Sequence, residues 1–225
     1  MRAFTNILLV FLFTACTSVP DERMTSYVDF PETRELTART LSLDSALFRY
    51  PYRVRVQDDK AVVLDLHGTE YFFHAFHYPG FHYLSSFGKR GDAPEEMLSA
   101  ENLRWNGNFL WTLDSNKSEL TRLGFASSGD SLLRLEAVSL DEELLRALDF
   151  VQYDDSTFII PDYSGDGRFC LVSRQGKLLR KIGTVPTANE DALKSARPAL
   201  AQAWRSFIDY NPRNGVLAAA TQLGE

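Results

Sequence analysis

The residues best suited to chemistry in this chain include four histidines that fall close together. His67, His74, His77 and His82 all lie within residues 67–82. Clustered imidazoles are typical of metal sites. Strand-like alternation puts His74 and His77 on opposite faces, and no pair has the spacing of a helical ligand motif. We therefore predict no metal site, and expect these rings to pack as aromatic side chains do.

An acidic turn gives a second candidate for chemistry. Asp162, Ser164, Asp166 and Gly167 spell D-x-S-x-D-G, which resembles the start of a calcium loop with its alternating oxygens. The twelfth position, which is acidic in an EF-hand, is Ser173. The stretch is therefore predicted to be a β-hairpin turn, with calcium bound in that loop as the alternative.

Three aspartates recur at nearly equal intervals. Asp65, Asp114 and Asp162 lie 49 and 48 residues apart, and each closes an apolar run. If they converged they could bind a metal or transfer protons. Repetition at the ends of strands favours a structural role in a turn. No Ser-His-Asp set stands out, so no catalytic residue and no cofactor is assigned, and no enzyme activity is predicted.

The two cysteines are far apart and indicate different roles. Cys170 lies in the apolar run RFCLVS and is predicted to be a buried small hydrophobe. Cys16 follows a basic and then apolar segment, residues 1–15, which is too short to span a bilayer and has the form of an export signal. Thr14, Ala15 and Cys16 resemble a bacterial lipobox, which implies lipidation of Cys16. A plain secretory signal is the alternative.

Residues 16–31 are polar and are predicted to form a flexible tether. Asp21 and Glu22, just after Cys16, resemble the surface-export signals of Bacteroides-type lipoproteins. That resemblance implies a lipoprotein that is held at the outer membrane by its N-terminal lipid and displayed on the cell surface. Two or more acyl chains would anchor it stably.

The histidines, the repeated aspartates and Cys170 all lie in or beside a repeat of strands in which apolar and polar side chains alternate. Tyr50–Asp65, Glu101–Asp114 and Leu148–Asp162 share one pattern, an apolar run, a polar turn and a second apolar run, and a fourth partial copy starts near Phe207. A period of this length, built of short strands, is typical of a β-propeller of four-stranded antiparallel blades. Residues 32–225 are therefore predicted to be one all-β propeller domain.

The alternation also predicts individual elements. Strands are expected at 53–57, 61–66, 70–78, 81–87, 101–105, 109–114, 118–125 and 132–137. A further strand at Glu32–Phe48 would complete a blade. A short helix is expected at Ser139–Leu148. A helical insertion near 189–206 would open with a Thr187–Glu190 capping box and be kinked or split by Pro198.

The fourth repeat ends after two strands, which would leave an open edge. We expect a C-terminally truncated form of a six-bladed parent. The alternatives are a four-bladed ring closed by the Glu32–Phe48 strand, and a product that does not fold stably.

Five stretches together carry a family resemblance, which covers Leu47–Glu225. They are LFRYPYRVRVQDDKAVVLDLHG, SFGKRGDAPEE, LDSNKSELTR, FIIPDYSGDGRF and AQAWRSFIDYNPRNGVLAAATQLGE. The chain resembles the TolB-like six-bladed β-propeller lipoproteins of Bacteroides-type bacteria. This resemblance implies a propeller in the cell envelope and supplies no catalytic residues.

The net charge and the fold class limit the kinds of function that this chain can have. The formal net charge of −6 and the lack of a basic patch exclude nucleic-acid binding. A propeller presents loops around a channel and favours a binding or scaffolding module for a protein, peptide or glycan. A lactonase- or lyase-like enzyme with a metal in the channel is the alternative. The sequence assigns no ligand-binding residue.

Overall fold

The computed structural model describes residues 32–41, 43, 48–187 and 189–223. The chain separates into two units, Met1–Thr40 and Leu41–Glu225. The predicted signal peptide, Cys16 and the tether lie outside the described residues. Within the part of the chain described here, no helix is long and apolar enough to cross a membrane.

The strand expected at Glu32–Phe48 is wrong over residues 32–41, which have neither helix nor strand. Their side chains are exposed, and charged residues such as Arg34 and Glu35 interrupt any apolar face that a sheet could bury. Residues 42 and 44–47 lie outside the described residues.

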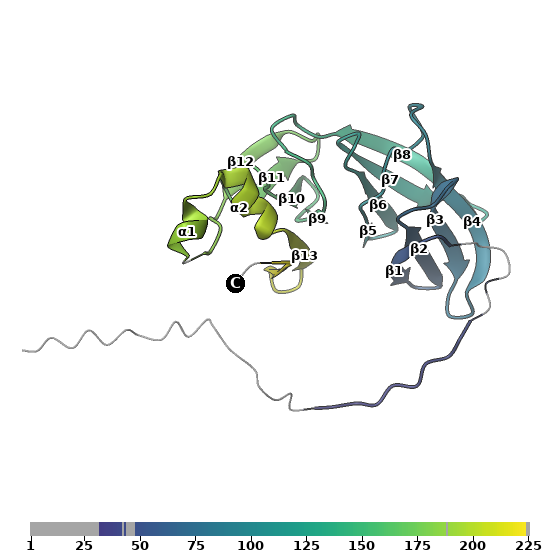
Figure 1. Ribbon diagram of the computed structural model, residues 1–225. Helices are drawn as coiled ribbons and strands as arrows, with labels where there is room; N and C mark the ends of the chain where they lie inside the picture. The colour runs from purple at the N-terminus through teal and green to yellow at the C-terminus, as the bar shows by residue number, and fades with distance from the viewer. Residues whose placement is uncertain (1–31, 42, 44–47, 188, 224–225) are drawn as a thin grey trace, which may run out of the picture. The chain divides into compact units, whose positions relative to one another are not determined.

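The second unit consists of three four-stranded antiparallel sheets and one hairpin (Figure 1). In each sheet the strands follow chain order. The first sheet comprises β1 (Pro51–Gln57), β2 (Lys60–Asp65), β3 (Tyr71–His77) and β4 (His82–Lys89). The second comprises β5 (Asn102–Asn106), β6 (Phe109–Asp114), β7 (Glu119–Phe125) and β8 (Leu132–Ser139). The third comprises β9 (Val151–Gln152), β10 (Thr157–Pro161), β11 (Phe169–Ser173) and β12 (Leu178–Ile182). The hairpin pairs β13 (Ser206–Asn211) with β14 (Val216–Thr221).

The first eight strands, β1 to β8, confirm the eight residue ranges that were predicted to be strands. The four-stranded sheets confirm the predicted organisation into blades. Tight turns join the strands because residues that tolerate a positive φ, such as glycine and aspartate, stand at the turn positions. Asn106 pairs with Phe109, so Gly107 and Asn108 form the two-residue turn, and the φ of 53° at Gly107 suits a glycine at its first position. Asp58 has a φ of 51° in the equivalent β1–β2 turn, a conformation that aspartate tolerates better than most residues.

The apolar cores lie between neighbouring sheets, as expected for stacked blades. One core joins the first and second sheets through residues such as Phe73 and Leu110, both fully buried. Another joins the second and third sheets through Trp111 and Phe158, whose ring centroids lie 5.1 Å apart. Neighbouring blades therefore share the cores in which their apolar side chains are buried.

The helix expected at Ser139–Leu148 is wrong: the segment forms turns. The Asp141 carboxylate accepts hydrogen bonds from the backbone N–H groups of Glu143 and Leu178, so it ties the loop to β12. Arg146 has a φ of 49°, which no continuing α-helix allows. Leu140, Leu144 and Leu148 are instead buried within this loop, whereas Leu145 is exposed.

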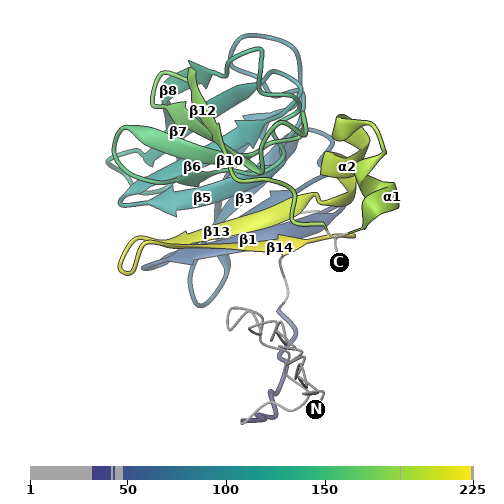
Figure 2. The same ribbon diagram turned by 90° about the vertical axis from the view of Figure 1, so that its left-hand side faces the viewer.

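The helical insertion near 189–206 is confirmed as two short helices, α1 (Glu190–Leu193) and α2 (Arg197–Ala203). Pro198 lies in the first turn of α2, which agrees with the predicted split. The predicted capping box is wrong, because Asn189 caps α1 by accepting from the N–H groups of Asp191 and Ala192. Figure 2 shows α2 leading directly into β13.

Candidate functional site

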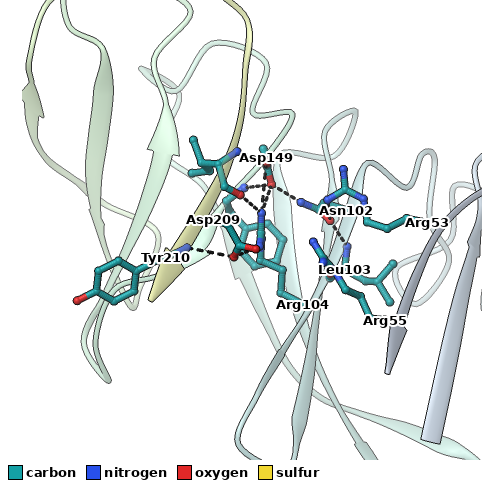
Figure 3. Close-up of polar contacts among 10 residues, drawn as sticks. Arg53, Arg55, Asn102, Leu103, Arg104, Asp149, Asp209 and Tyr210 are labelled. Carbon is teal, nitrogen blue, oxygen red and sulfur yellow. Dashed lines mark hydrogen bonds and ion pairs between the residues drawn. The ribbon is translucent and has the colours of Figure 1, made fainter. Parts of the chain in front are cut away.

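The strands β1, β5, β9 and β13 come first in the three sheets and in the hairpin, and they lie on the inner side of the arrangement (Figure 1). Polar side chains from these strands and from the residue before β9 meet there (Figure 3). Arg53 of β1 donates from Nη1 to the Asn102 Oδ1 of β5 at 2.6 Å. Arg55, two residues further along β1, makes one long hydrogen bond, from Nε to the Leu103 carbonyl oxygen at 3.4 Å. The first two blades are thus joined by side chains as well as by their apolar core.

Asp149, just before β9, is the centre of this network, and it is 2% exposed. Its carboxylate accepts from Arg104 Nη2 at 3.1 Å and from Asn102 Nδ2. It also accepts from two backbone N–H groups, those of Phe150 at 2.8 Å and Ile208 at 2.9 Å. One buried carboxylate therefore connects the second, third and fourth repeats. Buried charges are tolerated when they are paired and hydrogen-bonded in this way.

Arg104 extends from β5 to β13 (Figure 3). Besides Asp149 it contacts the Asp209 carboxylate at 2.9 Å, and it donates to the Ile208 carbonyl oxygen. The residue is 9% exposed, and its buried Nε has no hydrogen-bond partner.

A cavity of about 290 Å³ lies against this network. Arg55 and Arg104 contribute its cationic side chains, and Trp105, Gln152 and Tyr210 line it as well. The same two arginines line an adjoining hollow of about 370 Å³ with Arg53 and Asp209. Small-molecule sites typically combine an apolar wall with a few convergent polar groups.

The site has an excess of positive charge although the whole chain is acidic. Burial lowers the pKa of Arg55, and the nearby charges of Arg104 and Arg53 lower it further. In the network of Figure 3 three arginines face two carboxylates, Asp149 and Asp209. Within the described part of the chain, Arg55 makes one hydrogen bond, the long one to the Leu103 carbonyl oxygen, and no ion pair. This arrangement favours an anion near Arg55.

The structure places the four histidines apart from this site. His67, His77 and His82 are exposed, whereas His74 is 8% exposed and its Nδ1 lies 2.8 Å from Ser86 Oγ. Burial lowers the pKa of His74, so its imidazole is neutral at pH 7. The ring packs edge-on to Phe48 at 5.1 Å, which is the aromatic-like packing expected from the sequence.

The three repeated aspartates stay within their own blades. Asp65 accepts from the N–H groups of Arg49 and Tyr50, and Asp114 accepts from that of Leu98. Asp162 accepts from the N–H groups of Ser164 and Gly167 in its own turn. The predicted role in turns is confirmed for Asp162 and for Asp114, which also accepts from the N–H groups of Asn116 and Lys117 in the turn after β6. Asp65 is structural in another way, because it joins the end of β2 to the residues that precede β1. Among the described residues, no group of three or more His, Cys, Asp or Glu side chains is arranged to hold a metal ion.

The acidic turn after β10 is closed by basic side chains. Asp166 contacts Arg197 at 2.7 Å and Lys181 at 3.3 Å, and Lys181 also lies 3.8 Å from Asp162. The hydrogen bond from Arg197 lowers the pKa of Asp166 most, and the hydrogen bond and charge of Lys181 lower it further. The turn connects β10 to β11, as the hairpin prediction requires. Lys181 and Arg197 form ion pairs with the carboxylates that a calcium ion would need as ligands.

Cys170 is confirmed as a buried hydrophobe, 1% exposed, and burial raises the pKa of its thiol to about 12. We expect the folded Cys16→Ser variant, which retains Cys170 alone, to react with a thiol reagent at pH 8 at least about a hundredfold more slowly than the same chain unfolded in urea, because the thiolate is the reactive form. Absorbance of the released chromophore measures both rates. Equal rates would show that Cys170 is accessible.

The site residues were missed by reasoning from the sequence, although the repeat contained a signal for them. Arg53 and Asn102 are separated by the same 49 residues as Asp65 and Asp114, and so are Arg55 and Arg104. Alignment of the repeats therefore assigns these side chains to equivalent points on the first strand of each blade. In a propeller the first strands lie nearest the channel.

Stacked four-stranded antiparallel sheets, with polar side chains meeting on their first strands, define a β-propeller protein. The chain matches the TolB-like 6-blade propeller-like family over residues 29–225, and it belongs to that family. The resemblance seen in the sequence is confirmed. None of the curated proteins compared with the chain matches it.

Three solved structures are similar to parts of the chain. A candidate exported protein of Bacteroides fragilis is 14% identical with a TM-score of 0.52, and the match covers 67% of this chain and 42% of that one. A candidate 6-phosphogluconolactonase of the same species is 11% identical, with a TM-score of 0.44 and coverage of 60% and 40%. A protein of unknown function from Desulfotomaculum acetoxidans is 12% identical, with a TM-score of 0.43 and coverage of 75% and 54%. The chain thus spans about half or less of each of these structures, and the first of them shows the fold alone.

Proposed function

We propose that this protein is a non-enzymatic ligand-binding module of the bacterial envelope, and that the ligand binds on the inner strands beside Arg55 and Arg104. One observation carries the proposal: a cavity lined by these arginines lies over a buried carboxylate network in a chain with a net charge of −6. The network fixes the Arg104 guanidinium in place before any ligand arrives, and such preorganisation strengthens binding.

A thermal-shift screen of sugars, sugar acids, amino acids and short peptides tests this proposal. A ligand present at a hundred times its Kd adds about 2.7 kcal/mol to the free energy of unfolding. For a domain of this size that corresponds to a rise in Tm of about 5–10 °C. We expect at least one class of compound to produce such a rise. If no compound in the panel raises the Tm, the binding function is contradicted.

Export and anchoring complete the proposal. The candidate exported protein of Bacteroides fragilis shares the fold, and the first residues of this chain have the form of a lipoprotein signal. We place the protein at the outer membrane through lipidated Cys16, with Asp21 and Glu22 directing it to the cell surface. Protease treatment of intact cells tests the orientation, and complete protection would contradict surface display.

The Cys16→Ser variant is expected to lose its membrane association. A single hydroxyl replaces the thiol that would carry the diacylglycerol, so no thioether can form, and anchoring by acyl chains is lost. Incorporation of a clickable palmitate analogue, followed by fractionation of the cells, measures both effects. The Cys170→Ala variant is the matched control and should label like the native chain. Equal labelling of Cys16→Ser and native protein would contradict lipidation at Cys16.

A further inference from the structure

The hollow of about 370 Å³ beside the arginine network has two walls of different character. One wall consists of three arginines on the first strands of the first two sheets, Arg53, Arg55 and Arg104. The other wall is the β13–β14 hairpin, where Phe207, Ala218 and Ala220 line the hollow with hydrocarbon. Phe207 pairs with Ala220, and Asp209 pairs with Ala218, so these side chains share one face of the hairpin. That face is open to solvent, since Phe207 is 38% exposed and both alanines are exposed.

Arg53 and Arg55 carry the charges of this hollow that no carboxylate neutralises. Within the described residues neither forms an ion pair, whereas Arg104 pairs with both Asp149 and Asp209. Arg53 and Arg55 are alternate residues of β1, so they extend from the same face of the strand about 7 Å apart (Figure 3). Each makes one hydrogen bond, and none of their unbonded nitrogens is buried, so a ligand can reach the remaining N–H donors.

From these two walls we infer that the ligand is an amphipathic anion, which has a carboxylate or phosphate head group on an apolar body. This inference rests on the binding function proposed above and names its ligand class. The head group lies between Arg53 and Arg55, because planar guanidinium groups match the oxygens of carboxylates and phosphates. The apolar body packs on Phe207, Ala218 and Ala220, which removes apolar surface of both molecules from water.

The charges around Arg55 favour an anion at this position. Burial lowers the pKa of Arg55 most, and the charges of Arg104 and Arg53 lower it further. The charges of Asp209 and Asp149 raise this pKa, but each by less than either arginine lowers it. The neighbouring charges therefore produce a net positive potential at Arg55, and this potential stabilises an anion that binds there.

The hairpin wall favours an apolar body over a polyhydroxylated one. Phe207, Ala218 and Ala220 have no side-chain group that could bond a hydroxyl, and Asp209 already accepts from Arg104 Nη1 at 2.9 Å. Sugar hydroxyls against this wall would lose hydrogen bonds to water without replacing them, which is unfavourable. A hydrocarbon chain or ring has no such hydrogen bonds to lose.

Isothermal titration calorimetry of the full chain with octanoate and octyl phosphate tests the inference. Octanol has the same apolar body without a charge, acetate has the carboxylate without the body, and octylammonium carries the opposite charge. We expect the tighter-binding of the two anions to exceed each of these three compounds at least about tenfold in affinity, which corresponds to about 1.4 kcal/mol. The two anions are also added to the thermal-shift screen.

Arginine variants assign the binding to this hollow. Arg53→Met and Arg55→Met should each weaken binding of the anion at least about tenfold, because each removes charge-assisted hydrogen bonds to the head group. Arg180→Met removes an exposed arginine from β12 and is the matched control, which should leave binding unchanged.

Ala218→Asp tests the apolar wall and leaves the arginines in place. The new carboxylate repels the head group and replaces hydrocarbon that would contact the apolar body, so binding should weaken at least about tenfold. Ala219→Asp is the matched control. Ala219 is exposed like Ala218, but its side chain points to the opposite face of the hairpin and does not line the hollow. This control should bind the anion as the native chain does.

The outcomes separate this inference from the proposed function. Octanol or octylammonium that binds as tightly as both anions overturns the anionic head group, and acetate that binds as tightly as octanoate overturns the apolar body. Binding that Arg53→Met, Arg55→Met and Ala218→Asp all leave intact occurs elsewhere and overturns the inference. If neither anion binds while another compound of the thermal-shift screen does, the ligand class is wrong and the binding function stands. If no compound binds, both are overturned.

Discussion

Replacing Asp149 by alanine is expected to lower the free energy of unfolding by about 3–5 kcal/mol, the range for breaking a buried ion pair by removing one partner. The substitution leaves the Arg104 guanidinium buried without its main carboxylate. It also removes the acceptor of the Phe150 and Ile208 N–H groups. Because domains are typically stable by only about 5–15 kcal/mol, this loss brings the protein close to unfolding. Urea denaturation followed by circular dichroism measures it.

Asp209→Ala is the matched control, since it removes the other carboxylate that pairs with Arg104. The Asp209 side chain is 70% exposed, whereas that of Asp149 is 2% exposed. An exposed ion pair contributes about 0–1 kcal/mol, so this variant should be nearly as stable as the native protein. If both variants lose the same free energy of unfolding, Asp149 is not the centre that the structure indicates.

The second large effect is expected from Trp111→Ala, which should lower the free energy of unfolding by about 3–5 kcal/mol. Trp111 is 1% exposed and packs edge-to-face on Phe158 of the next sheet. The guanidinium carbon of Arg174 lies 4.2 Å from the centre of the indole ring. The substitution opens a void in the core that joins the second and third sheets, so it removes contacts from both blades.

Leu179→Ala, on β12, is the control for this experiment because Leu179 is 53% exposed. Its truncation should change stability by at most about 0.5 kcal/mol, the usual range for surface substitutions. Urea midpoints of both variants are compared with that of the native chain. A Trp111→Ala loss below about 1 kcal/mol would show that the two sheets do not share the core described here.

The strands and their turns were predictable because the interactions that specify them are local. A hairpin is specified within about a dozen residues, by apolar and polar side chains that alternate with a period of two and by a turn of two or three polar residues. Asn106–Gly107 is one example, and the 49-residue recurrence of Asp65 and Asp114 gave the blade repeat. The same reasoning failed at Ser139–Leu148, where leucines at helical spacing are buried by a loop. Burial between two sheets overrode the local preference there.

By itself, the sequence determined a repeated antiparallel blade, the burial of Cys170 and the structural role of the repeated aspartates. Only the tertiary structure decided the site, because its members are far apart along the chain. Arg104 and Asp209 are separated by 105 residues and meet at 2.9 Å. Their pairing depends on how whole sheets stack, and sheet stacking is set by cores that many blades share. Local patterns specify a strand and its exposed face, whereas the partner of a long side chain is fixed by packing over the whole unit.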